Sequence, residues 1–203
     1  MFYLFLLLFV LLCLGLFASV FKNGRLGLAA KIFRIFTVVT AGLAFAYLFT
    51  ERSIDSYKQN SLAVQVINLL PLPLDFYVVK VNDSANADQK YIVKHLGKIR
   101  SNYYRIEHLD MKNSDQFWIS GFMGKKNQVY FTQHAVPNKN MDQIVEVKNY
   151  INQSSKLSAI SKDQVIASGL SNVKTAVWIT LDLLLFFLNL ALLLRKPKGK
   201  LIK

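Results

Sequence analysis

The sequence predicts a membrane protein of mixed α and β structure, with three transmembrane helices and an extracytoplasmic β-rich domain. Three observations lead to this prediction. Long apolar runs lie near both ends of the chain, at residues 1–50 and 173–194. The region between them, residues 51–172, is made of short runs rich in β-branched and aromatic residues. The chain is 53% hydrophobic and only 18% charged, which is typical of a membrane protein with one modest soluble domain.

Residues 1–50 predict two transmembrane helices joined by a polar turn. Residues 1–21 are almost all apolar, and no charge precedes Lys22. Because a secretory signal normally begins with basic residues, a retained helix is favoured over a cleaved signal. The second helix is expected near residues 26–50, with the polar turn before it.

Two pairs of residues in the second helix have expected roles in the membrane. Gly42 and Ala46 form a small-xxx-small pair, which would let two helix backbones approach closely. Lys31 and Arg34 precede the uninterrupted apolar part of the helix. Their long side chains are expected to anchor the helix at the lipid headgroups. A site for an anion or a specific headgroup is the alternative.

The third helix, residues 173–194, carries a polar stripe formed by Thr175, Asp182 and Asn189. Trp178 is expected to anchor its outer end at the headgroups. An aspartate near the middle of a membrane helix costs roughly 2.5–3.5 kcal/mol for insertion, so Asp182 needs an explanation. The stripe predicts an intramembrane polar contact, either with the second helix or with a partner subunit. A proton- or ion-conducting carboxylate is the alternative.

The distribution of basic residues predicts the orientation of the chain. The net charge is +13, but residues 51–172 account for only +4 of it. Most of the excess lies in the first turn and in the basic tail, residues 195–203. The positive-inside rule then places the turn and tail in the cytoplasm, with the N-terminus and residues 51–172 outside. We expect a bacterial inner membrane, a periplasmic domain and no nucleic-acid partner.

The outer domain is expected to be an antiparallel sheet folded into a small sandwich or half-open barrel. Pro71 and Pro73 would end any helix that continues from the membrane through residues 51–70. The best hairpin signal is Gly124–Asn127, and residues 154–171 are expected to form a short helix or a loop. Six strands are expected: Phe76–Val81, Tyr91–Leu96, Tyr103–Met111, Phe117–Met123, Val129–Val136 and Ile144–Ile151.

Residues with catalytic or metal-binding chemistry are sparse. Cys13 is the only cysteine and lies in the first apolar run, so the chain has no internal disulfide and no thiolate metal cluster. His95, His108 and His134 fall on three different predicted strands, and a zinc site made of the three would require the fold to bring them together. Nothing in their spacing favours this, and no cofactor or metal is expected.

These observations favour a non-catalytic accessory or assembly subunit of a larger inner-membrane complex. Its expected partners are other integral membrane subunits and the lipid bilayer. A membrane-anchored sensor that captures a small molecule or an envelope component is the alternative, and an envelope enzyme is a third. A lined pocket in the outer domain would favour the sensor, whereas a flat apolar surface or an edge strand would favour the subunit.

Overall fold

The structure is a computed structural model that describes residues 2–21, 24–54, 62–82, 89–124 and 127–195. It divides into two compact units. We call Met1–Asp55 with Ser171–Lys203 the helical unit, and Ser56–Leu170 the β domain. Apart from Arg195, the basic tail lies outside the described residues.

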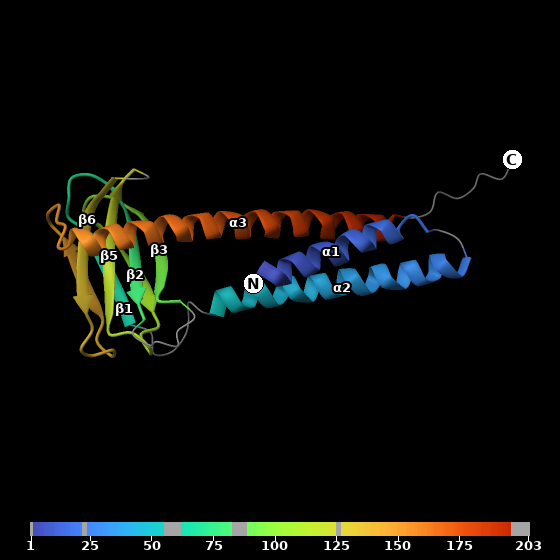
Figure 1. Cartoon of the computed structure of the whole chain (residues 1–203), viewed down its shortest axis with the longest axis horizontal. Coiled ribbons are helices and arrows are strands. Elements are labelled where there is room, and N and C mark those ends of the chain that lie inside the picture. Colours follow the sequence, from blue (N-terminus) through green and yellow to red (C-terminus); the bar gives the residue numbers. More distant parts are fainter. Residues whose placement is uncertain (1, 22–23, 55–61, 83–88, 125–126, 196–203) are drawn as a thin grey trace. The chain divides into compact units, whose positions relative to one another are not determined.

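The helical unit contains α1 (Phe2–Ala18), α2 (Gly24–Ile54) and most of α3 (Ser155–Leu194). Figure 1 shows α1 and α2 side by side. Two helices, α2 and α3, are long and apolar enough to cross a membrane. Helix α1 is also apolar but shorter, at 17 residues. The described chain is therefore a mixed α and β protein with two long apolar helices that could span a bilayer.

Helix α3 is longer than the sequence suggested, because it begins at Ser155 and continues without a break to Leu194. The Ser154 hydroxyl accepts a hydrogen bond from the backbone N–H of Leu157 at 3.3 Å and so caps the first turn. The segment expected to be a short helix or loop is thus the start of the last apolar helix. One helix belongs in part to the β domain and in part to the helical unit (Figure 1).

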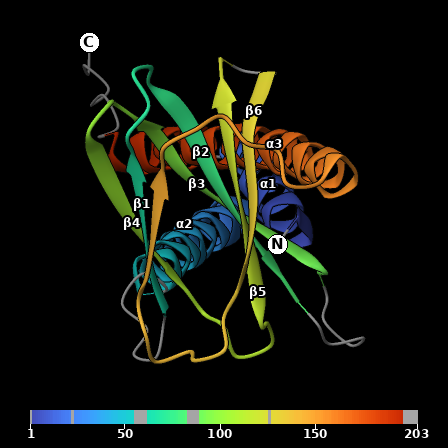
Figure 2. The same ribbon diagram turned by 90° about the vertical axis from the view of Figure 1, so that its left-hand side faces the viewer.

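Seven strands form in the described part of the β domain, arranged in two sheets. The three-stranded sheet has the order β4-β1-β7, and the four-stranded sheet has the order β3-β2-β5-β6. All pairings are antiparallel except the parallel pair of β1 and β7. The strands are β1 (Leu62–Asn68), β2 (Leu74–Val81), β3 (Tyr91–Ile99), β4 (Tyr103–Leu109), β5 (Gln116–Met123), β6 (Asn127–Ala135) and β7 (Gln143–Val147). Figure 2 shows β4 and β1 side by side.

Strand β1 corrects the expectation that a helix could continue from the membrane to residue 70. Leu62, Val64 and Val66 are buried while the residues between them are half-buried, which is the two-residue period of a strand. Residues 55–61, which that helix would also have included, lie outside the described residues. The predicted hairpin joins β5 to β6, and Gly124 has a φ of 70°, which favours glycine.

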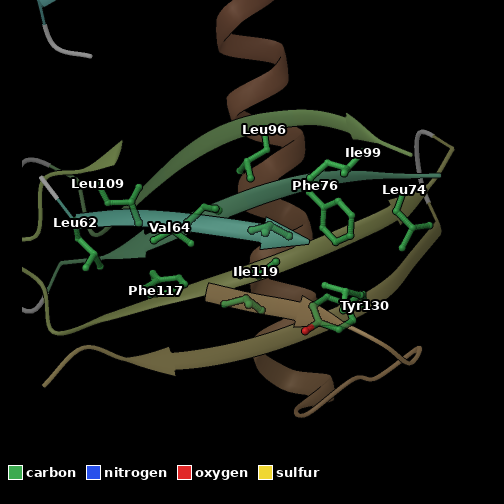
Figure 3. Close-up of a cluster of buried hydrophobic side chains, with 14 of the residues drawn as sticks. Leu62, Val64, Leu74, Phe76, Leu96, Ile99, Leu109, Phe117, Ile119 and Tyr130 are labelled. Carbon is green, nitrogen blue, oxygen red and sulfur yellow. The ribbon is translucent and has the colours of Figure 1, made fainter. Parts of the chain in front are cut away.

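The main core lies between the two sheets (Figure 3). Leu62, Val64 and Leu109 come from the three-stranded sheet, and Phe76 and Ile119 come from the four-stranded sheet. A glycine makes room for the largest of these side chains. A Cβ atom on Gly121 would lie only 2.9 Å from Cε1 of Phe76. The core therefore depends on a close approach of the β5 backbone to an aromatic ring.

A second cluster covers the other face of the four-stranded sheet. Trp118 and Phe131 of that sheet pack with Val165 of α3, and Leu157 lies against the same cluster. A buried pair of hydroxyls also joins the two elements. The Oγ atoms of Ser120 in β5 and Ser161 in α3 lie 2.7 Å apart. The β domain therefore has three layers: a three-stranded sheet, a four-stranded sheet and the first turns of α3.

Candidate functional site: helix interface and exposed sheet face

Asn189 of α3 forms the centre of a polar cluster inside the helical unit. Its side chain is fully buried, and its Nδ2 donates to the Leu12 carbonyl of α1 and to the Leu185 carbonyl of α3, both at 3.0 Å. Gly15 of α1 lies close to this amide, since a Cβ there would be 3.1 Å from Oδ1 of Asn189, a tight contact. Thr37 of α2 is buried beside the same glycine. All three helices therefore meet at Asn189.

Arg34 lies inside this interface, where the sequence had suggested a side chain reaching for lipid headgroups. It is only 9% exposed, and its Nη2 donates to the Asn189 carbonyl at 3.3 Å. Lys31, one turn earlier on α2, is exposed. The two side chains are three residues apart and therefore point in different directions around the helix. That of Arg34 faces α3, whereas that of Lys31 remains exposed. Arg34 therefore joins the polar contact predicted for Asn189.

Asp182 is fully buried on α3, seven residues before Asn189. Within the described residues, neither of its carboxylate oxygens has a hydrogen-bond partner. Seven residues of helix correspond to a rise of about 10 Å, so Asp182 and Asn189 occupy different levels of the interface. The stripe predicted from sequence thus contains two unlike groups. Asn189 binds another helix, whereas Asp182 is a buried carboxyl group without a bonded partner in the described chain.

The other predicted membrane residues take varied positions. Thr175 is half-buried and its hydroxyl donates to the Ser171 carbonyl of its own helix at 3.0 Å. Trp178 packs edge-to-face on Phe9 of α1, with 5.7 Å between ring centroids. Gly42 faces the Phe186 ring of α3 at 3.9 Å from its ideal Cβ position, and Ala46 is exposed. A Cβ at position 42 would therefore make only an ordinary van der Waals contact with that ring.

The three histidines lie on β3, β4 and β6, and no cluster of metal-ligating side chains forms among the described residues. His134 stacks on Phe117, and its Nε2 lies 2.8 Å from the Thr132 hydroxyl. Burial lowers the pKa of His134 below its ordinary value, so the neutral imidazole is favoured. His108 is exposed on β4.

His95 belongs to a cross-strand cluster that the sequence did not indicate. Its Nε2 lies 2.7 Å from Oδ1 of Asp75, and the Tyr77 hydroxyl donates to Oδ2 of the same carboxylate at 3.1 Å. Burial, reinforced by the Asp75 charge and this hydrogen bond, raises the pKa of Tyr77 to about 12. Tyr77 therefore stays protonated at neutral pH and acts as a donor. The alternation of side chains along a strand places residues 75 and 77 on one face. Which residue of β3 lies beside them depends on the register of the two strands, which the sequence does not reveal.

The outer face of the three-stranded sheet carries several exposed apolar side chains. Ile106 of β4 and Ile144 of β7 both lie opposite Gln65 of β1, and they are 50% and 64% exposed. Tyr104 lies opposite Ile67 in the adjacent row and is 58% exposed. We call Ile67, Tyr104, Ile106 and Ile144 the outer apolar face. Side chains from the three strands therefore form an exposed, partly apolar surface in which Gln65 lies between the two isoleucines. Exposed apolar surface commonly marks an interaction site.

The alternation of side chains that builds this face is visible in the sequence, but the order in which the strands lie side by side is not. Tyr104 and Ile106 share a face of β4 because they are two residues apart. Ile144 lies on the other side of β1, on a strand nearly forty residues later, and the parallel pairing of β1 with β7 brings it to this face. No family model, curated protein or solved structure matches the chain.

Proposed function

We propose that this protein is a non-catalytic accessory or assembly subunit of a larger complex in a bacterial inner membrane. The observation that carries the proposal is the outer apolar face, where Tyr104, Ile106 and Ile144 are each at least half exposed. A soluble domain gains stability by covering such side chains, and a partner protein can cover them. The proposed partner is another integral membrane subunit with an apolar surface outside the bilayer.

The proposal includes three membrane spans with the N-terminus outside. Helix α2 has 31 residues, a length of about 46 Å by helical rise, which exceeds a hydrocarbon core of about 30 Å. The 17 residues of α1 rise only about 25 Å, so its span would need the bilayer to thin or its ends to extend. The β domain would then face the periplasm, with the basic tail in the cytoplasm.

A reporter that is active only outside the cytoplasm tests this topology. Inserted between Asn82 and Gln89, it is expected to be active, because the β domain is proposed to be periplasmic. Fused after Lys203, it is expected to be inactive. A fluorescent reporter that folds only in the cytoplasm should give the reverse pattern at both positions. Activity of the first reporter after Lys203 would contradict the orientation and the proposed compartment.

The location of Asp182 and Asn189 also bears on where a partner would bind. Both side chains are fully buried, and the Asn189 amide is already bonded to carbonyls of α1 and α3. A partner subunit would therefore meet the apolar outer sides of the helices or the outer apolar face of the β domain. Of these two, the outer apolar face is the better evidence, because exposed apolar side chains on a membrane helix are already satisfied by lipid.

Changing Ile106 and Ile144 together to aspartate is expected to reduce recovery of the partner by about tenfold or more. Two charges would be buried at the contact, where apolar side chains of the partner offer them no hydrogen bond. The measurement is quantitative mass spectrometry of proteins that co-purify with the tagged full-length chain in a mild detergent. Thermal unfolding of the variant should match that of the wild type, which separates loss of binding from loss of fold.

The matched control is Ile151→Asp. Ile151 is 43% exposed on the same domain but lies outside the three-stranded sheet. A partner that binds the outer apolar face should be recovered with this variant as with the wild type. Equal recovery with the Ile106 and Ile144 variant would contradict the proposed surface. Photo-crosslinking from position 144, but not from position 151, would support it independently.

A further inference from the structure

A groove of about 540 Å³ opens at the end of the β domain where β3 turns into β4. Figure 3 shows Leu74 and Ile99 together at one end of the sandwich, and Ile99 lines the groove. Among the described residues, its lining contains three cations and two aromatic rings but no acidic side chain. These five residues, which we call the basic groove, are Lys98, Arg100, Tyr103, Tyr104 and Arg105.

Buried hydrogen bonds fix the backbone around the basic groove. Asn68, at the end of β1, is fully buried, and its Nδ2 donates to the carbonyls of Ile99 at 2.9 Å and Leu72 at 3.0 Å. Its own backbone carbonyl accepts from the Asn102 N–H at 2.7 Å. Asn102 has a φ of 61°, which asparagine tolerates better than most residues. One buried amide therefore ties the β3–β4 turn to the segment before β2.

Arg105 is held in place by a second local feature. Its Nη1 donates to the Leu96 carbonyl at 2.8 Å, reaching from β4 to β3. Gly97 makes this possible, because a Cβ there would lie 3.1 Å from Nη1 of Arg105. The glycine has a φ of 84° and lies where the pairing of β2 with β3 shifts register. The guanidinium therefore has a defined position, and its other N–H groups make no hydrogen bond within the described residues.

The cations of the basic groove have no acidic partner among the described residues, unlike Lys94 and Lys139. Lys94 pairs with Glu107 at 2.9 Å, and Lys139 pairs with Asp115 at 2.7 Å. Within the described residues, the side chains of Lys98 and Arg100 make no hydrogen bond or ion pair. Asp75 lies opposite Lys98 in the sheet, but its carboxylate is bound by His95 and Tyr77. The groove thus concentrates positive charge that no acidic side chain of the described residues neutralises.

We propose that the basic groove binds a phosphate group, carried either by a soluble molecule or by a lipid headgroup. Guanidinium groups donate in pairs to phosphate oxygens, and a lysine adds a mobile point charge. Tyr103 and Tyr104 add hydroxyl donors and ring surface for the part of the molecule beyond the phosphate. The volume of about 540 Å³ is large enough for more than a bare phosphate ion. This inference does not depend on the proposed role as a subunit, and it gives the sensor alternative a concrete ligand chemistry.

The test uses the purified full-length chain in an uncharged detergent and isothermal titration calorimetry with two probes. One probe is glycerol phosphate, which carries a soluble phosphate monoester. The other is phosphatidylglycerol, supplied in micelles of the same detergent. The test variant combines Lys98→Gln with Arg100→Gln, both exposed side chains whose loss breaks no bond within the described residues. The control combines Lys112→Gln with Lys156→Gln, which removes the same charge from exposed positions outside the groove.

The wild type and the control variant are expected to bind at least one probe with similar affinity. The groove variant is expected to bind the same probe about tenfold to a hundredfold more weakly. If the wild type binds glycerol phosphate and the groove variant binds it more weakly, the ligand is a soluble phosphate compound. Binding of phosphatidylglycerol alone, weakened in the groove variant, would identify a lipid headgroup. Added salt should weaken either interaction, since the groove is open to solvent. No saturable binding of either probe, or equal weakening in both variants, would overturn the proposal.

Discussion

Replacing Asp182 with leucine is expected to stabilise the helical unit by about 1–3 kcal/mol, the usual cost of a buried polar group without a hydrogen-bond partner. The carboxyl group is fully buried, and neither oxygen is bonded within the described residues. Leucine has a similar length and removes that cost. The measurement is thermal or denaturant unfolding of the full-length chain in detergent. The matched control is Asp163→Leu on the exposed side of α3, where a change below about 0.5 kcal/mol is expected.

Asparagine at position 182 distinguishes a structural role from a functional one. An amide keeps hydrogen-bonding capacity but cannot titrate, so it should give little of the stabilisation expected from leucine. If Asp182 carries protons, Asp182→Asn should abolish the activity of the complex as fully as Asp182→Leu while leaving the complex assembled. Loss of stability of the helical unit with leucine would instead mean that the carboxyl group makes a stabilising bond, and the expected gain would be refuted.

Phe76→Ala is expected to destabilise the β domain by about 3–5 kcal/mol, as large-to-small changes of buried aromatic residues generally do. The ring is fully buried, packs edge-to-face on Tyr130 and lies against the backbone at Gly121. Strand backbones on both sides limit collapse of the resulting cavity. Denaturant unfolding of the full-length chain, followed by circular dichroism in the β region, measures the change.

Tyr150→Ala is the control for this prediction. Tyr150 is 48% exposed, so removing its ring leaves no internal cavity, and a change near 0.5 kcal/mol is expected, about the size usual for surface substitutions. Destabilisation by both variants to the same extent would contradict the location of the core between the two sheets. Destabilisation by Phe76→Ala alone would support it.

Local sequence patterns predicted most strands but not how they pair. Runs rich in valine, isoleucine and aromatic residues identified β2 through β7, with ends that differ by a few residues. Strand β1 was missed although Leu62, Val64 and Val66 alternate correctly, because an apolar helix precedes it and a helical face could also be drawn through Leu62 and Val66. The parallel pairing of β1 with β7 could not be inferred, since register depends on contacts between distant segments.

The helical unit shows a similar limit. The spacing of Asp182 and Asn189 predicted that both lie on one face of the helix, and both are buried. Depth along a helix does not reveal which way a neighbouring helix is rotated, so the burial of Arg34 was not predicted. Gly15 carried no signal of its own, because a lone glycine in an apolar run is ordinary. The basic groove was also not predicted, since Gly97 and Asn68 position its arginine and its turn from other strands.

The parallel pairing of β1 with β7 has a consequence for the order of events during synthesis. Val64 lies opposite Gln143, so β1 emerges from the ribosome long before its second neighbour exists. Until then one edge of β1 has unpaired backbone groups and can pair with other chains. The last layer of the domain is supplied by α3, the helix that then continues as the final apolar segment. The nascent β domain therefore completes its fold only as the last helix is made, and a chain truncated before Gln143 should be a target for chaperones and proteases.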